Sequence, residues 1–67
     1  MITVNGSAAD LRAGARLVDV LDALGIEPAR RGVAIAVDGE VVPRARWEQT
    51  SLADGARVEV VQAIQGG

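Results

Sequence analysis

Residues 17–26 have the sequence LVDVLDALGI, and this stretch decides the fold. Its apolar residues recur at the spacing of one helix face, which predicts an amphipathic helix of about two turns. These residues are Leu17, Val20, Leu21 and Leu24. Gly25 suits the left-handed position after a helix, and Ile26 can fold back onto Leu21 as in a Schellman motif. No Ser, Thr, Asn or Asp stands directly before Leu17, so the sequence leaves the N-cap open.

Two hairpins are predicted, one on each side of this helix. Asn-Gly and Asp-Gly pairs tolerate the positive φ angles of a type I′ turn, and each pair here lies near apolar residues. The first hairpin is centred on Asn5-Gly6, with a weaker returning strand over residues 7–11. The second is centred on Asp38-Gly39, after a strand at residues 33–37 in which β-branched residues alternate with alanine. Pro43 limits the returning strand, which therefore belongs at a sheet edge.

The last strand is predicted over residues 57–64, after a turn at Asp54-Gly55. Alternation places Val58, Val60 and Gln62 on one face and Arg57, Glu59, Val61 and Ala63 on the other. Trp47 and Leu52 lie in an irregular connection that we expect to cover one end of the core. The predicted core between helix and sheet contains Leu21, Leu24, Ile35, Val37 and Val60.

The predicted order is strand, strand, helix, strand, strand, strand. A single apolar helix face must be covered by a sheet. The simplest closed arrangement places the first and last strands side by side and parallel, with a hairpin on each flank. This is an α+β fold of the β-grasp, ubiquitin-like class. Its mixed sheet has four to five strands, with the main helix packed across one face and the other face open.

The composition excludes most catalytic chemistry. The chain of 67 residues contains no Cys and no His, so we predict no catalytic triad, no thiol nucleophile and no metal site. The net charge is −2 without a basic stripe, which argues against nucleic acid. No apolar run approaches the roughly 18–20 residues that span a bilayer. All seven basic residues are arginine, so no lysine amine is present. We expect a cytoplasmic protein that is not an enzyme.

The chain ends in Gly66-Gly67, directly after the last predicted strand. We therefore expect a domain of residues 1–64 and a flexible diglycine tail of residues 65–67. Glycine has no Cβ, so such a tail can enter a narrow active-site channel that side chains would block. A carboxylate is a poor electrophile until it is adenylated, so a partner enzyme would have to activate the carboxyl group of Gly67.

Six segments follow one another in an order that is specific as a set: residues 4–6, 20–26, 38–44, 47–48, 52–61 and 66–67. The most specific part is residues 39–44 followed by Trp47. Together these segments resemble the small sulfur carriers of thiamine biosynthesis, the ThiS family, over essentially the whole chain. The residues just before the diglycine, Ala63-Ile64-Gln65, are smaller and more polar than in many members.

The resemblance implies a carrier cycle in which this chain is a protein co-substrate. A ubiquitin-activating-like adenylyltransferase of the ThiF type would use ATP and magnesium to adenylate Gly67. Sulfur from a persulfide donor would then produce a C-terminal thiocarboxylate, which a thiazole synthase of the ThiG type would consume. Gly66, Gln65 and Ile64 would thread into the partner, and the chain itself would bind no cofactor.

The open sheet face at the base of the tail is the candidate docking surface. We expect Val61 and Ala63 to form its apolar part, with Arg57 and Glu59 at the rim. The small subunit of molybdopterin synthase, or a carrier for cysteine synthesis, would keep the same chemistry in another pathway. A ubiquitin-like protein modifier would instead end in an isopeptide bond to a target lysine. A binding module whose glycines have no role is the remaining alternative.

Overall fold

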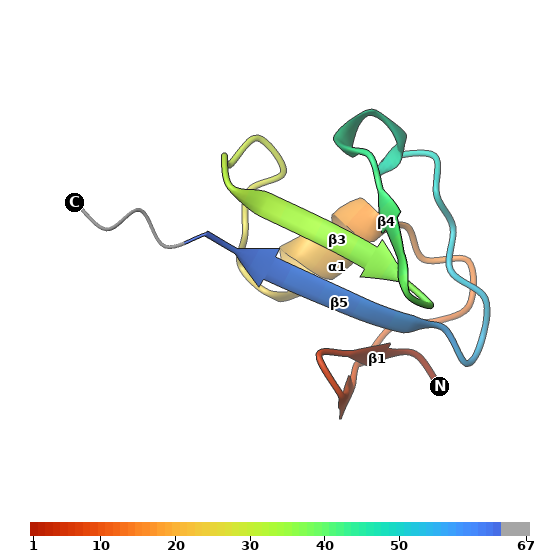
Figure 1. Cartoon of the computed structure of the whole chain (residues 1–67). Coiled ribbons are helices and arrows are strands. Elements are labelled where there is room, and N and C mark those ends of the chain that lie inside the picture. Colours follow the sequence, from red (N-terminus) through yellow and green to blue (C-terminus); the bar gives the residue numbers. More distant parts are fainter. Residues whose placement is uncertain (64–67) are drawn as a thin grey trace.

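The structure is a computed structural model that describes residues 1–63 (Figure 1). Its elements are β1 (Thr3–Val4), β2 (Ser7–Ala8), α1 (Leu17–Ala23), β3 (Val33–Val37), β4 (Glu40–Val42), a 3₁₀ helix (Arg44–Arg46) and β5 (Arg57–Gln62). The strands form one five-stranded sheet in the order β2-β1-β5-β3-β4. β1 and β5 are parallel, and the other neighbouring pairs are antiparallel. The predicted β-grasp fold is therefore confirmed.

Local hydrogen bonds define both ends of the α1 helix. Its N-cap is Arg16, whose backbone N–H donates to the Asp19 carboxylate at 2.8 Å, so Asp19 at position N3 supplies the half of a capping box that satisfies the N-cap backbone. At the other end Gly25 has a φ of 73°. The N–H of Ile26 donates to the carbonyl of Leu21 at 2.8 Å, and that of Gly25 donates to Asp22 at 3.0 Å. These two bonds confirm the predicted Schellman motif.

The core lies between α1 and one face of the sheet. The buried hydrophobic residues are Ile2, Val4, Leu17, Val20, Leu21, Ile26, Ile35, Trp47, Leu52, Ala56, Val58 and Val60. Trp47 and Leu52 cover the core as predicted, and the Trp47 indole donates to the Val42 carbonyl at 2.9 Å. Among the described residues, no buried side-chain polar atom lacks a hydrogen-bond partner.

Leu24 is a correction to the predicted core. It is 44% exposed, because α1 ends at Ala23 and Leu24 is the C-cap residue, where the backbone leaves the helical path. The chain then reverses at Gly25, and Ile26 is buried against the core in its place, with 6% of its surface exposed. Leu24 instead lines a surface pocket beside Val4 and Leu11, between the helix and the first hairpin.

Three further predictions are only partly correct. Val37 is half-buried rather than buried, because it ends β3 where the hairpin begins. The strand predicted at residues 7–11 is limited to Ser7–Ala8, since the chain leaves the sheet toward α1. The strand predicted at residues 57–64 ends at Gln62, and Ala63 lies outside it. Both hairpins have the expected positive φ angles, 52° at Asn5 and 50° at Asp38.

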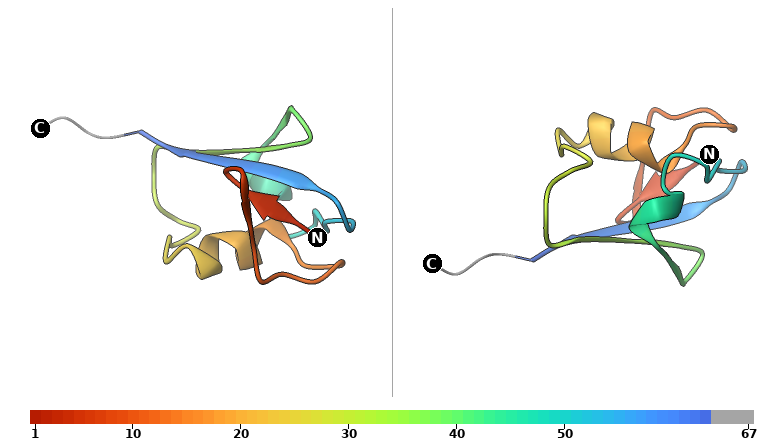
Figure 2. Two further views of the ribbon diagram at one scale, coloured as in Figure 1. Left: turned by 90° about the horizontal axis from the view of Figure 1, so that it is seen from below. Right: turned by 90° about the horizontal axis from the view of Figure 1, so that it is seen from above.

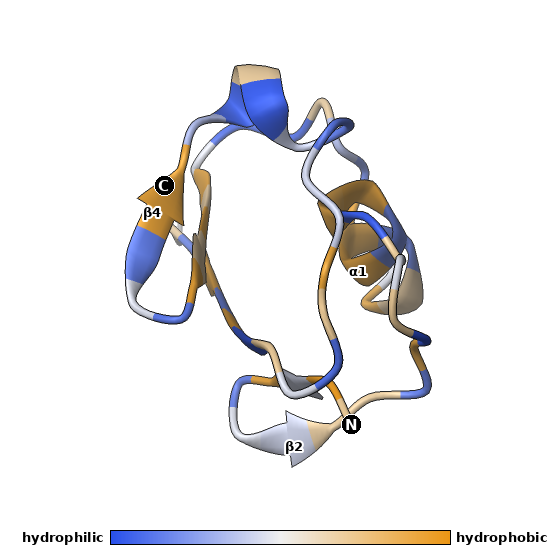
Figure 3. Cartoon of the chain, turned by 90° about the vertical axis from the view of Figure 1, so that its right-hand side faces the viewer, coloured by the Kyte–Doolittle hydropathy of each residue, from blue (hydrophilic) through white to orange (hydrophobic). Residues whose placement is uncertain are grey.

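The molecule has two layers, with α1 on one face of the sheet only. Figure 2 shows the helix below the sheet in one view and above it in the other. In Figure 3 the helix and the sheet enclose the interior that the core side chains fill, and the 3₁₀ helix at the top is hydrophilic. Within residues 1–63 no helix is long and apolar enough to cross a membrane. The second face of the sheet stays uncovered, as predicted.

Candidate docking face and tail base

The uncovered face of the sheet is formed mainly by alternate residues of β5. Val58 and Val60 point into the core, so Arg57, Glu59, Val61 and Ala63 lie on the other side, and all four are exposed. The structure therefore brings together on one face the four residues that the sequence predicted for docking. We call this surface the open face.

Neighbouring strands extend the open face with aliphatic side chains. Val61 is opposite Ala34 of β3, and Glu59 is opposite Ala36, which is in turn opposite Val41 of β4. Val61 is 62% exposed and Val41 is 74% exposed, which is unusual for valine and leaves apolar surface in water. Val41 was not predicted for this surface, because its place on the open face follows from the register of β4 on β3. The available signal was the period of two along a strand, which puts Val41 and Val42 on opposite faces of the sheet.

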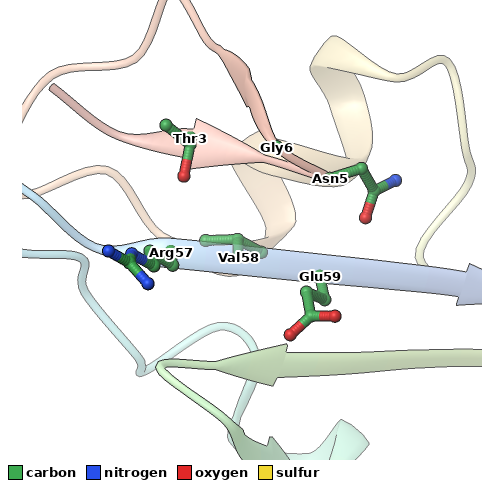
Figure 4. A pocket seen from close by; sticks show the side chains of 6 residues that line it. All are labelled: Thr3, Asn5, Gly6, Arg57, Val58 and Glu59. Carbon is green, nitrogen blue, oxygen red and sulfur yellow. The ribbon is translucent and has the colours of Figure 1, made fainter.

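The opposite end of the open face is polar. Thr3, Asn5, Gly6, Arg57, Val58 and Glu59 line a surface pocket between β1 and β5 (Figure 4). The ion pair found among residues 1–63 joins the Met1 amino group to Asp54, and this contact lowers the pKa of the Asp54 carboxyl. Arg57 and Glu59 form no ion pair with another residue of that described part of the chain. Their charges are therefore available at the rim of the aliphatic surface.

Ala63, the last described residue, is held against the loop of residues 28–32. Its N–H donates to the carbonyl of Gly32 at 2.7 Å, which continues the β3–β5 pairing one step past Gln62. Gly32 has a φ of 77°, and a Cβ at this position would lie 3.2 Å from the Ala63 Cβ. A side chain at this position would therefore meet both an unfavourable backbone conformation and a tight contact with Ala63.

Arg44 attaches this loop to the rest of the fold. Its guanidinium donates to the Pro28 carbonyl and, at 2.6 Å, to the Arg30 carbonyl. The same group lies over the Trp47 ring, 4.4 Å from the centroid, where a cation–π contact adds to the two hydrogen bonds. A buried tryptophan thus supports, through one arginine, the loop that holds Ala63.

The close approach of Gly32 to Ala63 gives the first prediction. Gly32→Ala should lower the free energy of unfolding by about 1–3 kcal/mol, because it adds both backbone strain and a tight contact. Gly14→Ala is the matched control, since Gly14 also has a positive φ of 94° but has no atom within 4 Å of a new Cβ. Urea denaturation of both variants measures the difference. An equal loss in the two proteins would show that the Ala63 contact contributes nothing.

The other predicted site residues, Ile64, Gln65, Gly66 and Gly67, lie outside the described residues. The boundary between residues 1–64 and the tail therefore stays a prediction. β5 ends at Gln62, and the described chain reaches Ala63 at the aliphatic end of the open face. The tail residues thus follow, in the sequence, directly after that end of the open face.

Comparison with known proteins agrees with this architecture over nearly the whole chain. The model of the ThiS family matches residues 2–67. A curated relative, the sulfur carrier protein ThiS of Escherichia coli (strain K12), is 32% identical over 66 residues, which cover 98% of this chain and 97% of the relative.

Two solved structures from Geobacter metallireducens are similar to the fold. The crystal structure of the thiamine biosynthesis protein ThiS has a TM-score of 0.74 and 31% identity, covering 98% of this chain and 97% of that one. A solution structure of a thiamine biosynthesis protein has a TM-score of 0.77 and 32% identity, covering 98% and 86%.

A β-grasp domain followed in the sequence by Gly66-Gly67 is typical of ubiquitin-like carrier proteins. Because the family model and the relatives match from end to end, the chain belongs to the ThiS family of sulfur carrier proteins in thiamine biosynthesis. Members of this family act as carriers alongside partner enzymes.

Proposed function

We propose that this chain carries sulfur on the carboxyl group of Gly67 for the synthesis of the thiazole ring of thiamine. A ThiF-type adenylyltransferase, with ATP and magnesium, converts the Gly67 carboxylate into an acyl adenylate and releases pyrophosphate. The terminal sulfur of a persulfide then attacks the acyl carbon, and AMP leaves. A thiol reduces the resulting S–S bond, so that the carrier keeps one sulfur as a thiocarboxylate. A ThiG-type thiazole synthase takes up that sulfur.

The observation that carries this proposal is the family match, which extends through residue 67 and includes the diglycine. The composition supports it, since the chain has no Cys, His or Lys that could act as a nucleophile in its own right. Gly66, Gln65 and Ile64 thread into the partner's channel in this scheme. ATP and magnesium belong to the activating enzyme, and the carrier supplies only the acyl group.

We propose further that the open face docks on the activating enzyme. Val61, Ala63 and Val41 provide exposed apolar surface, and such surface beside a polar rim is typical of interaction sites. Arg57 and Glu59 are exposed charges on the same face, and charges of this kind guide the encounter with a partner. Docking there leaves the tail residues at the edge of the contact, where they can enter the partner's channel.

Reversing one rim charge tests the docking face. Glu59→Arg should slow association with the activating enzyme by about tenfold at low salt, because rim charges act mainly on the association rate. The difference should shrink as salt increases, since the charge is exposed and screened. Asp22→Arg makes the same change of charge on α1, on the covered side of the sheet, and should leave association nearly unchanged. Equal rates for both variants and the native chain would remove Glu59 from the interface.

The carrier chemistry itself is tested by mass. The native chain is incubated with a ThiF-type enzyme, ATP, magnesium and a persulfide source, and its intact mass is measured. We expect a gain equal to the difference between sulfur and oxygen, followed by loss of that sulfur when thiazole synthase and its substrates are added. A chain that gains no sulfur contradicts the proposal, and a chain found only as a lysine conjugate identifies a protein modifier.

A further inference from the structure

Strand β5 is longer than its parallel neighbour β1. The parallel pairing covers Thr3 with Arg57 and Val4 with Val58, and the chain then turns at Asn5. Val60 presents its backbone N–H and carbonyl to the same edge of β5 as Val58 does, because hydrogen-bonding direction alternates along a strand. No backbone of β1 continues far enough to pair with Val60.

The side chain of Asn5 occupies that place. The N–H of Val60 donates to Asn5 Oδ1 at 2.8 Å, and Asn5 Nδ2 donates to the Val60 carbonyl at 3.3 Å. The backbone N–H of Asn5 donates to the Val58 carbonyl at 2.8 Å, which continues the regular ladder. A carboxamide offers one acceptor and a donor side by side, as a peptide group does, so Asn5 acts as one more strand residue. Figure 4 shows Asn5 at the end of β1, beside β5.

This contact lies close to the base of the tail. On the β3 side, β5 is paired as far as Gln62, and Ala63 bonds to the Gly32 carbonyl. On the β1 side, the last hydrogen bonds among the described residues are those between Val60 and Asn5. The end of β5 is thus held along one edge by backbone and along the other by a single side chain, 55 residues away in the sequence.

We infer that Asn5 is a positioning residue for the carrier tail: its amide fixes the end of β5, from which the tail reaches the partner's active site. The inference rests on the proposed function. The simpler role for Asn5 is that of a turn residue, since Asn tolerates the positive φ of 52° found here. That role needs only the backbone conformation, whereas positioning needs the amide. The two roles therefore predict different results for different substitutions.

Asn5→Gly separates these roles, because glycine adopts a positive φ at least as readily and removes only the amide. Asn5→Asp keeps the shape and the acceptor for the Val60 N–H, but it sets a carboxylate oxygen against the Val60 carbonyl. Hydrogen exchange measures the contact directly. In Asn5→Gly, which removes the acceptor, the Val60 amide should exchange about 2- to 10-fold faster, the change that loss of an ordinary hydrogen bond produces, whereas in Asn5→Asp it should keep its protection. The Ile35 amide serves as the internal reference, and unchanged exchange at Val60 relative to it in Asn5→Gly would overturn the inference.

Sulfur acquisition from the activating enzyme tests the role in the tail. For Asn5→Gly we expect kcat to fall about 2- to 10-fold, because small misplacements of a reacting group are costly. KM should be nearly unchanged, since the substitution removes none of the side chains proposed to dock, Arg57, Glu59, Val61 and Ala63. Val20→Ala is the control for stability, because it weakens the core under α1 and leaves the Asn5 amide in place. At a temperature where both variants are folded, Val20→Ala should keep the native kcat.

The outcomes separate the two levels of the proposal. If the native chain acquires sulfur and Asn5→Gly does so with the same kcat, Asn5 has no positioning role and the carrier function stands. If Val20→Ala loses as much kcat as Asn5→Gly, the effect is general stability, and the inference is again overturned. A native chain that acquires no sulfur overturns the proposed function and, with it, the role of Asn5 in the tail, whatever the exchange rate at Val60.

Discussion

Deleting Gly67 should abolish sulfur acquisition while leaving the fold and its stability unchanged. The deletion moves the terminal carboxylate back by one residue, which is about 3.3–3.6 Å of extended chain. Displacements near 1 Å can already reduce catalysis about 10²-fold, so adenylation should be close to undetectable. The core lies between α1 and the sheet, and its last residue along the chain is Val60. Circular dichroism and the melting temperature should therefore match those of the native chain.

A second deletion tells whether residue identity or tail length matters. Removing Gln65 shortens the chain by the same one residue but keeps Gly66-Gly67 at the end. If length decides, both deletions lose activity, and if the terminal diglycine decides, the Gln65 deletion keeps part of it. Intact-mass measurement after incubation with the activating enzyme, ATP, magnesium and a persulfide source distinguishes these results. Equal sulfur acquisition by the native chain and the Gly67 deletion would show that Gly67 is not the carrier residue.

Local patterns predicted the fold because each element carries its own signal. The spacing of Leu17, Val20 and Leu21 marks one helix face, and the Asn-Gly and Asp-Gly pairs mark the hairpins. Leu24 fits the same spacing but is exposed. Periodicity shows which side of a helix is apolar, but it does not show at which residue the helix ends. Gly25 indicates that residue, since a left-handed residue after Leu24 makes Leu24 the C-cap.

The residues of the open face were predictable for the same reason, and the contacts that support the end of β5 were not. Alternation along β5 separates Val58 and Val60 from Arg57, Glu59 and Val61 without knowledge of any neighbour. Strand register and long-range contacts require the folded chain. Val41 joins the open face only through the pairing of β4 with β3, and Asn5 reaches Val60 across 55 residues of sequence. The sequence alone does not distinguish an Asn that only forms a turn from an Asn whose side chain also bonds to a neighbouring strand, as Asn5 does.

The proposed carrier function needs a rigid support for the tail, and the core provides it from few side chains. Chains of this size bury only about 60% of their unfolded surface, and this one has no disulfide. A domain of this length is stabilised by roughly 3–10 kcal/mol at the usual 0.05–0.15 kcal/mol per residue. Each fully buried side chain therefore accounts for a large share of the total, and Leu21 is 0% exposed under the sheet.

Leu21→Ala should accordingly lower the free energy of unfolding by about 2–5 kcal/mol, as other large-to-small core substitutions do. In a domain this small, that loss should lower the melting temperature by at least roughly 10 °C. Leu24→Ala is the matched control, because it makes the same change three residues along the same stretch, where the side chain is 44% exposed. Its cost should stay below about 1 kcal/mol. Urea denaturation compares the two variants, and similar losses in both would show that the helix does not pack on the sheet through Leu21. A much larger loss for Leu21→Ala would confirm that the helix packs on the sheet through the side that carries Leu21.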